Sequence, residues 1–279
     1  MELRFFNKKG EVRFFGGGSE GNWHIIEVEG LGLLPLTTQT VNYYGEHGQK
    51  TVSKTMPGRP ITITAEVKGA DRNDRAKIVS ETLRILAKDG VLAVRTFRER
   101  VVDCYLKDLR EGNRDGNFRT YVFQFMCDDC YFRDRNETEV MLSGRADLLK
   151  DGFIIGDGIV LTERRCGGRI NNNSDVEVRG KLILVCNREG CVVVKNKTTG
   201  AELRLSGEAG NLYEIDLDER TIVDGDNVDC IGILNDDCYM SEFYLAEGVN
   251  DIVVSDVEGN DMVGSLKYVY FKKYVEATD

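Results

Sequence analysis

Hydrophobic and polar positions alternate with a period of two along most of the chain. The clearest cases are residues 60–67, Pro-Ile-Thr-Ile-Thr-Ala-Glu-Val, and residues 119–127, in which Tyr121, Phe123 and Phe125 share one face. Such alternation is typical of β-strands with one buried face. We expect the aromatic row of the second segment to lie in a core, because rows of this kind pack more often than they bind ligands.

One segment has a helical period instead. Apolar residues recur at spacings of three or four from Ile78 to Leu86, and Asp71-Arg72-Asn73-Asp74 offers an N-cap before them. Gly90 stands where a helix of this length is expected to stop. The pattern predicts one helix over residues 73–88, lying on one face of an N-terminal sheet.

From about residue 153, short strand-like segments alternate with turn-forming residues. Asn187-Arg188-Glu189-Gly190 and Asp224-Gly225-Asp226-Asn227 are typical of these turns. Strands at a spacing of ~8–12 residues indicate a β-sandwich. The predicted fold is therefore mainly β, with a single helix. It comprises an N-terminal β-sandwich-like domain (1–140), a linker (141–152) and a C-terminal β-sandwich (153–279).

Residues 37–56 are expected to form a long hairpin arm around the polar tip Gly45-Glu46-His47-Gly48. The segment is rich in Thr, Val and Tyr, which suit a pleated strand. Its larger apolar residues are Val41, Tyr43, Tyr44, Val52 and Met56. These are too few to bury the arm against its own domain. The arm either pairs with a neighbouring chain or is a surface hairpin without a partner, and the composition leaves both open.

The composition excludes several classes of chemistry. The 279 residues include two histidines, His24 and His47, and neither lies in a catalytic motif. We expect the eight cysteines to be reduced, because the first residues lack the apolar stretch of a secretory signal. Cys127 and Cys130 form a lone CxxC without the second pair that zinc requires. We expect no enzyme activity, no cofactor and no metal.

Charge is distributed unevenly along the chain. Residues 1–135 have a net charge of +3, whereas residues 136–279 have a net charge of −13. This asymmetry favours two domains with different surroundings. The acidic half argues against specific nucleic-acid binding, since phosphate contacts need clustered Lys and Arg. No apolar run approaches the ~18 residues of a membrane span, so no membrane partner is expected.

Two further features of the second half suggest ligands only weakly. Tyr268, Tyr270 and Tyr274 are expected to share one face of the last strand, where they could stack on a sugar or pack against a partner. The segment from Asp224 to Asp229 resembles a calcium loop, but its glycine is misplaced and the closing Glu is absent. The carboxylates offer no pair that stands out as a glycosidase site.

The order of four stretches resembles a known family. They are Trp23 to Leu33 followed by the Thr-rich arm, Gly58-Arg59-Pro60-Ile61-Thr62-Ile63, residues 121–132, and the series 169–172, 194–200, 213–216 and 243–250. In this order the chain resembles the phage distal tail protein family, called Dit, of long-tailed phages and prophages of Gram-positive bacteria. Two positions depart from the family pattern, because Cys130 and Glu247 stand where prolines are expected.

The resemblance implies a structural role at a phage tail tip. Six copies would form a ring through their N-terminal domains, with each hairpin arm embracing the adjacent subunit. The ring would join the tail tube protein to the tail-tip hub protein and surround a channel for DNA. The galectin-like C-terminal domains would point outward and could carry a receptor-binding protein. The chain would be made in the bacterial cytoplasm and reside in the virion.

Two other functions compete with this one. A carbohydrate-binding module or adsorption protein would use the tyrosine row at 268–274 to hold cell-wall sugar. Against this, the single tryptophan is Trp23, in the first domain, where it cannot serve a sugar site in the second. A peptidoglycan hydrolase is the weakest hypothesis, because no nucleophile or metal motif accompanies the two histidines.

Overall fold

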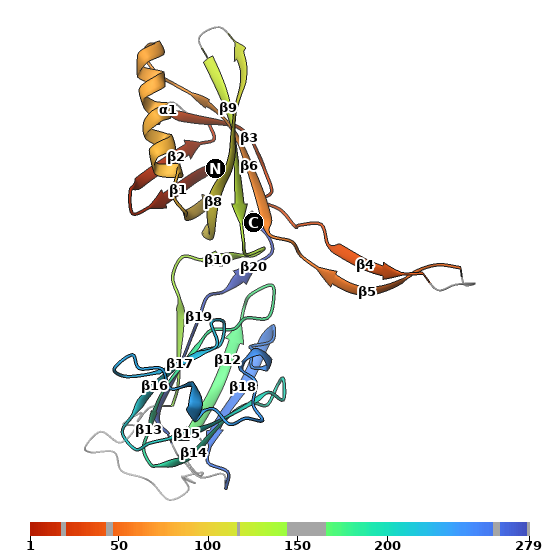
Figure 1. The fold of residues 1–279 in the computed structure, drawn as a ribbon, viewed down its shortest axis with the longest axis vertical. Coiled ribbons are helices and arrows are strands. Elements are labelled where there is room, and N and C mark those ends of the chain that lie inside the picture. The colour runs from red at the N-terminus through yellow and green to blue at the C-terminus, as the bar shows by residue number, and fades with distance from the viewer. Residues whose placement is uncertain (18–20, 43–46, 116–117, 144–165, 259–262, 278–279) are drawn as a thin grey trace, which may run out of the picture. The chain divides into compact units, whose positions relative to one another are not determined.

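The computed structural model describes residues 1–17, 21–42, 47–115, 118–143, 166–258 and 263–277. The chain divides into two compact units. One comprises Met1–Arg135 together with Tyr274–Asp279, and the other comprises Asn136–Lys273. The prediction of a mainly β fold is confirmed (Figure 1). The predicted linker, 141–152, falls largely outside the described residues, although its first three residues belong to a strand.

The first unit contains one large sheet, a separate two-stranded arm and a helix. Its elements are β1 (Glu2–Asn7), β2 (Gly10–Phe15), β3 (Trp23–Glu29), β4 (Thr37–Val41), β5 (Lys50–Thr55), β6 (Arg59–Val67), α1 (Arg72–Leu86), β7 (Gly90–Arg95), β8 (Glu99–Asp115), β9 (Phe118–Cys127) and β10 (Phe132–Asp134). β20 (Lys273–Tyr274), from the end of the chain, lies at the edge of the large sheet beside β10.

The large sheet closes on itself. Its order is β20-β10-β8-β7-β1-β2-β3-β6-β9, and the long strand β8 pairs with both β7 and β9. The first unit is therefore barrel-like rather than a pair of stacked sheets. Tyr121, Phe123 and Phe125 on β9 are buried, and Phe123 packs edge-on against Trp23 with 4.9 Å between ring centroids. The aromatic row belongs to the core, as predicted.

The helix α1 begins as predicted and ends earlier. The side chain of Asp71 accepts a hydrogen bond from the Asp74 amide at 2.8 Å, which caps the first turn. The helix stops at Ala87 rather than at Gly90. Gly90 instead begins β7, where a Cβ atom would lie 2.5 Å from the Phe5 ring. The sequence pattern identified a required glycine there but assigned it the wrong role.

The strand β3 contains a β-bulge that the alternating pattern did not reveal. The register with β6 shifts between Ile25 and Glu27, which leaves Ile26 as the extra residue. The faces of the strand exchange at that point. Ile25 and Val28 therefore pack against the core, whereas Ile26 is 59% exposed.

The second unit is a sandwich of two antiparallel sheets. Its strands are β11 (Thr138–Ser143), β12 (Cys166–Asn172), β13 (Lys181–Cys186), β14 (Gly190–Asn196), β15 (Glu202–Gly207), β16 (Leu212–Asp216), β17 (Thr221–Asp224), β18 (Gly248–Ser255) and β19 (Val263–Tyr270), with 3-10 turns η1 (Ile231–Ile233) and η2 (Met240–Glu242). The orders β11-β19-β13-β16-β17 and β12-β18-β14-β15 enclose one apolar core.

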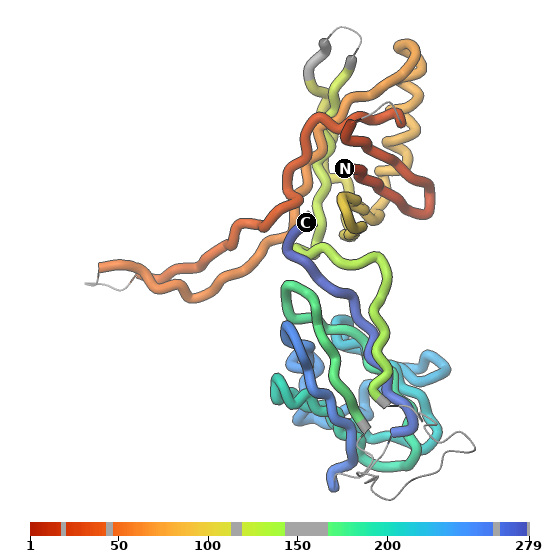
Figure 2. Tube along the Cα trace, turned by 180° about the vertical axis from the view of Figure 1, so that it is seen from behind, coloured from red at the N-terminus to blue at the C-terminus, as the bar shows by residue number. Residues whose placement is uncertain are grey.

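The last segment of the chain belongs to both units. The last strand was predicted to carry Tyr268, Tyr270 and Tyr274 together, but β19 ends at Tyr270. The chain then enters the sheet of the first unit at β20, and Ala277 is buried in the core of that unit. The C-terminal segment lies beside the first unit in both views (Figures 1 and 2). The second unit is thus an insertion between two segments of the first.

Candidate functional site: an exposed arm and its buried anchor

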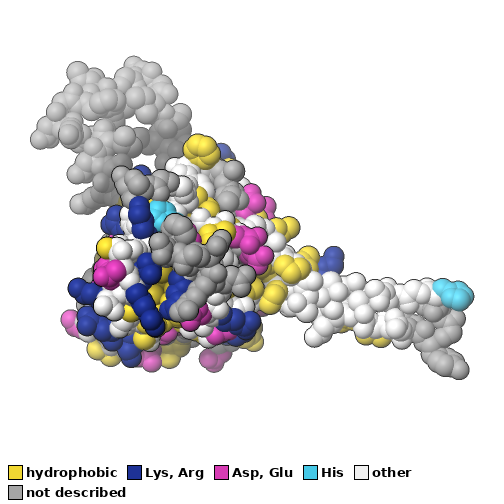
Figure 3. All heavy atoms as spheres, turned by 90° about the horizontal axis from the view of Figure 1, so that it is seen from above, with side chains coloured by type: hydrophobic (Ala, Val, Ile, Leu, Met, Phe, Trp, Pro, Cys, Tyr) yellow, Lys and Arg dark blue, Asp and Glu magenta, His cyan; other side chains and the backbone are white. Residues whose placement is uncertain are grey.

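The arm consists of β4 and β5, which pair only with each other among the described strands. Every described residue of β4 is exposed, and on β5 only Ser53 is half-buried. The side chains along it are mostly uncharged and polar (Figure 3). An isolated two-stranded hairpin is marginally stable in water, because it has no apolar face to bury. Its two outer edges offer unpaired backbone groups to another strand.

The structure locates three of the five predicted arm residues. Val41 is 45% exposed, Val52 is 63% exposed and Met56 is half-buried. Tyr43 and Tyr44 lie outside the described residues. The exposed valines contribute little to the stability of this chain alone. A partner that covered them would bury their apolar surface, which would stabilise the complex.

The base of the arm, in contrast, is fixed by a buried arginine. Arg59 opens β6 directly after the arm, and its side chain is completely buried. Its Nη1 donates to the carbonyl oxygens of Gly30 and Gly32 at 2.7 and 2.6 Å, in the connection between β3 and β4 that leads into the arm. One guanidinium therefore links the segment that precedes the arm, at Gly30 and Gly32, to the segment that follows it, at Arg59.

The same guanidinium reaches two further segments. Nε donates to the Cys130 carbonyl at 2.9 Å, and Nη2 donates to the Val275 carbonyl at 2.6 Å. The guanidinium carbon lies 4.5 Å from the centroid of the Phe132 ring. Burial lowers the pKa of Arg59 from its ordinary value. The charge is held by carbonyl dipoles, an aromatic face and the nearby negative charge of Asp129, and together these offset the cost of burying a cation.

Close backbone contacts at the base require glycine. Gly30 has a φ of +89°, and a Cβ atom there would lie 2.1 Å from the Pro60 carbonyl oxygen. A Cβ atom on Gly58 would lie 2.8 Å from the Cys127 carbonyl oxygen. The sequence Gly58-Arg59-Pro60 contains the signal of this anchor, but a charged residue between Gly and Pro is more typical of an exposed turn.

The C-terminal tail completes the anchor. The Ala277 amide donates to the Leu31 carbonyl at 2.9 Å, and Arg100 donates to the Glu276 carbonyl. The Arg100 guanidinium also lies 4.0 Å above the centroid of the Tyr274 ring. Burial, followed by the charge of Asp134, raises the pKa of Tyr274 to about 12. The tail is therefore a structural strap across the base of the arm.

The predicted tyrosine row does not form a binding face. Tyr268 is fully buried and Tyr270 is 2% exposed, both within the sandwich core. Tyr274 belongs to β20 and packs in the first unit. The alternation of β19 continues to Tyr270 only, because the chain leaves the sandwich there. No ring of the three presents an open face for a sugar.

Three buried asparagines organise one end of the sandwich, a feature that sequence reasoning missed. Asn196 Nδ2 donates to Asn250 Oδ1 at 3.1 Å and to the Tyr244 carbonyl at 2.8 Å. Asn172 Nδ2 donates to the Leu245 carbonyl at 3.3 Å. These amides hold the loop before β18. Three of the stretches that carried the family resemblance, 169–172, 194–200 and 243–250, therefore meet in space. Their role is to position backbone, as expected of satisfied buried amides.

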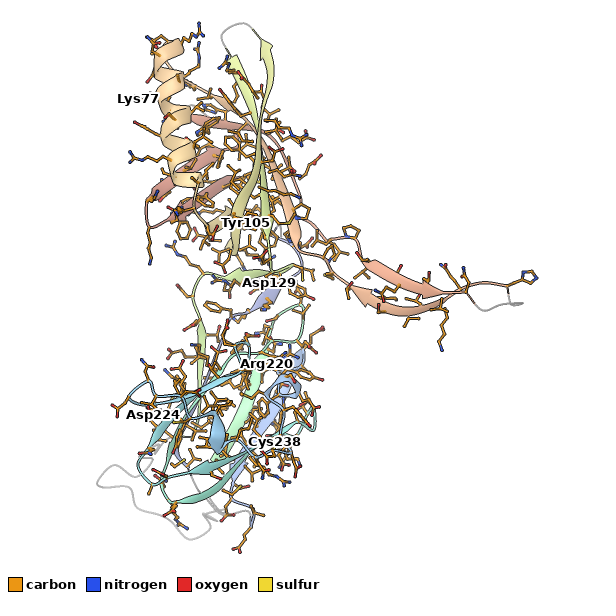
Figure 4. All side chains as sticks on the ribbon, in the orientation of Figure 1. Lys77, Tyr105, Asp129, Arg220, Asp224 and Cys238 are labelled. Carbon is orange, nitrogen blue, oxygen red and sulfur yellow. The ribbon has the colours of Figure 1, made fainter. Side chains whose placement is uncertain are left out.

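Other candidate chemistry does not converge on a centre. Cys127 is buried and Cys130 half-buried, and both are free thiols. Burial, followed by the charge of Asp129, raises the pKa of Cys130. Asp224, labelled in Figure 4, accepts hydrogen bonds from the backbone amides of Asp226 and Val228, so its carboxylate is already occupied within its own loop. Within the described ranges, no group of three or more His, Cys, Asp or Glu could hold a metal ion.

No described helix has the length and apolar character needed to cross a membrane. No family model matches the chain, and no curated protein sequence matches it significantly.

Solved structures, however, resemble this one over nearly its whole length. The Dit protein of phage SPP1, a paradigm of the hub adsorption apparatus in phages that infect Gram-positive bacteria, matches with a TM-score of 0.70 and 14% identity. This match covers 90% of this chain and 93% of that chain. A chain of the phage P2 baseplate in its activated conformation with Ca matches with a TM-score of 0.51 and 12% identity, covering 99% of each. The chain has the fold of these tail proteins, so the resemblance seen in the sequence is confirmed for the fold.

Proposed function

We propose that this protein is a structural component of a phage tail tip, in which six copies form a ring through their first units. The observation that carries the proposal is the arm, an exposed pair of strands whose base is held by four hydrogen bonds from the buried Arg59. A hairpin that gains nothing from its own unit would gain burial and strand pairing from a neighbour. The fold shared with a hub protein and a baseplate protein supports the same role.

The ring would join the tail tube protein to the tail-tip hub, with DNA passing through its centre. The sandwich unit would face outward and could anchor a receptor-binding protein. The proposed role is structural rather than enzymatic. The net charge of −13 in the second half suits a position away from DNA phosphates. Burial of the tyrosine row removes the observation that favoured a sugar-binding module.

The experiment is the solution mass of the purified chain by light scattering, with negative-stain images of the same peak. Six copies of the 31.4 kDa chain have a mass of about 188 kDa. We expect a pored ring near that mass. A matched variant with Val41→Asp and Val52→Asp should shift to smaller species while its circular dichroism spectrum is unchanged, because both residues are exposed. A variant that assembles like the parent would contradict the role of the arm.

A further inference from the structure

A groove in the first unit lies between the strand β2 and the helix α1. It has a volume of about 470 Å³. Its walls are Val12 and Phe15 of β2, Trp23 at the start of β3, and Ile78 and Ile85 of α1. Glu11, Arg13 and Glu81 also line it. The lining of the groove is thus mainly apolar, with three charged side chains among the apolar ones.

One wall of the groove is an unpaired strand edge. β2 pairs with β1 along its whole length, but with β3 only at Phe14 and Phe15. Residues 10–13 of β2 therefore face no other strand on that side within the described part of the chain. Such an edge is a template for another strand.

The register shows which backbone groups this edge presents. Residues opposite each other in an antiparallel pair alternate between exchanging both hydrogen bonds and exchanging none. Asn7 and Gly10 close the hairpin, and the Gly16 amide donates to the Met1 carbonyl, so the even-numbered residues of β2 bond to β1. The amide and carbonyl groups of Glu11 and Arg13 consequently point away from β1, toward the groove.

We infer that this groove receives the arm of a second copy, whose strand β5 adds to the free edge of β2. The inference rests on the proposed ring and names the surface that the arm would occupy. The free edge of four residues, about 13 Å long, is matched by the six residues of β5. The exposed Val52 would enter the apolar part of the groove.

Charge favours β5 over β4 as the added strand. β5 carries Lys50 and Lys54, whereas β4 carries no charged residue. In the groove, Glu11 pairs with Arg13, while Glu81 makes no ion pair with any described residue. A lysine from β5 would supply that partner. Arm and groove are different surfaces of one unit, so their contact is head-to-tail, the type that closes into a ring.

The test places a photo-crosslinking benzoylphenylalanine at position 52 in the full chain. Equal amounts of ¹⁵N-labelled and unlabelled chain are mixed before irradiation, and mass spectrometry maps the crosslinked peptides. Crosslinks between labelled and unlabelled copies should fall within residues 10–15 and 78–85. The matched control carries the same group at position 97, where Phe97 is 91% exposed in the connection between β7 and β8. It should not label these two segments.

Charge reversal sharpens the test. Glu81→Lys should lower the crosslinking yield about fivefold, and adding Lys54→Glu to the same chain should restore it. Assembled particles whose crosslinks lie elsewhere on the second copy would overturn the groove assignment and leave the ring proposal standing. A chain that remains monomeric by light scattering, without crosslinks between copies, would overturn both.

Discussion

The shaft of the arm and its base are opposite in almost every physical respect. The shaft, β4 and β5, is almost entirely exposed and pairs with no other described strand. The base contains Arg59, the largest fully buried side chain of the protein's described part, which donates to four carbonyl oxygens. Stability is therefore concentrated where the arm begins and is nearly absent where it extends.

This difference bears on the role proposed for the arm. Ordering a segment costs conformational entropy, and the described shaft recovers little of it through burial. A buried charge is also expensive unless every donor is satisfied. A fold that fixes the base of a hairpin in this way, while nearly all the described residues of its strands stay exposed, has the form that the proposed neighbouring chain would require. The following predictions test that comparison, beginning with the base.

Replacing Arg59 should have the largest effect. Arg59→Met keeps much of the side-chain volume but leaves four partly buried carbonyl groups without their donor. We expect the free energy of unfolding of the first unit to fall by about 3–5 kcal/mol. Urea denaturation followed by Trp23 fluorescence reports this unit, because the only tryptophan lies in its core.

Arg59→Lys is the matched control. It keeps the positive charge but cannot reach the separate carbonyls with a planar fork, so it should also destabilise the unit, by less than Met. If Arg59→Met unfolded at the same urea concentration as the parent, the guanidinium would not be the anchor described above.

Removing the C-terminal strap should come next. A chain that ends at Tyr274 loses the acceptors at Val275 and Glu276 and the buried Ala277. We expect the first unit to lose about 2–4 kcal/mol, since hydrogen bonds to charged donors contribute about 1.5–3 kcal/mol each. Proteolysis within residues 31–36 should accelerate as well. A truncated chain with unchanged stability would show that the tail merely rests on the unit.

These two predictions concern features that the sequence could not reveal. The period of two identified β6 and β9, and the helical period identified α1, because local patterning reflects which face is buried. The return of residues 274–277 to the first unit depends on contacts more than 200 residues apart, which no local pattern records. Arg59 was quoted only as part of a motif, because burial of a cation depends on carbonyls supplied by distant segments.

Alkaline pH should weaken the strap through Tyr274. The pKa of Tyr274 is raised to about 12, from an ordinary value of 10.0. Between these values the unfolded chain releases the phenolic proton while the folded chain retains it, so stability falls as pH rises from about 10 to 12. Tyr274→Phe should flatten this dependence in urea titrations of the first unit. An identical slope in both proteins would refute the assignment.

The smallest expected effect is a difference in stability between Phe variants of two buried tyrosines in the sandwich. The Tyr270 hydroxyl donates to the Asn171 carbonyl at 3.2 Å, whereas the Tyr268 hydroxyl has no partner among the described residues. Tyr270→Phe should cost about 1 kcal/mol, and Tyr268→Phe should be neutral or slightly stabilising. Thermal unfolding of the two variants checks this. The opposite ranking would mean that Tyr268 has a partner.

The predicted tyrosine row also shows where periodicity fails. Residues 268, 270 and 274 have the spacing of a single strand face, but the strand ends between the second and the third. Likewise, the bulge at Ile26 reverses the faces of β3 within an apparently regular segment. Both irregularities arise where the chain must change sheets or bend, and the residues there carry no Gly or Pro to mark it.

The most direct test of the account is hydrogen exchange of the arm, measured by mass spectrometry on assembled and dilute, dissociated protein. The account predicts that amides of residues 37–41 and 50–55 exchange rapidly in the dissociated chain and are protected in the assembly. The amides around Arg59 should be protected in both. Equal protection of the arm in both states, or rapid exchange of the arm within the assembled particle, would contradict the claim that a neighbouring chain completes it.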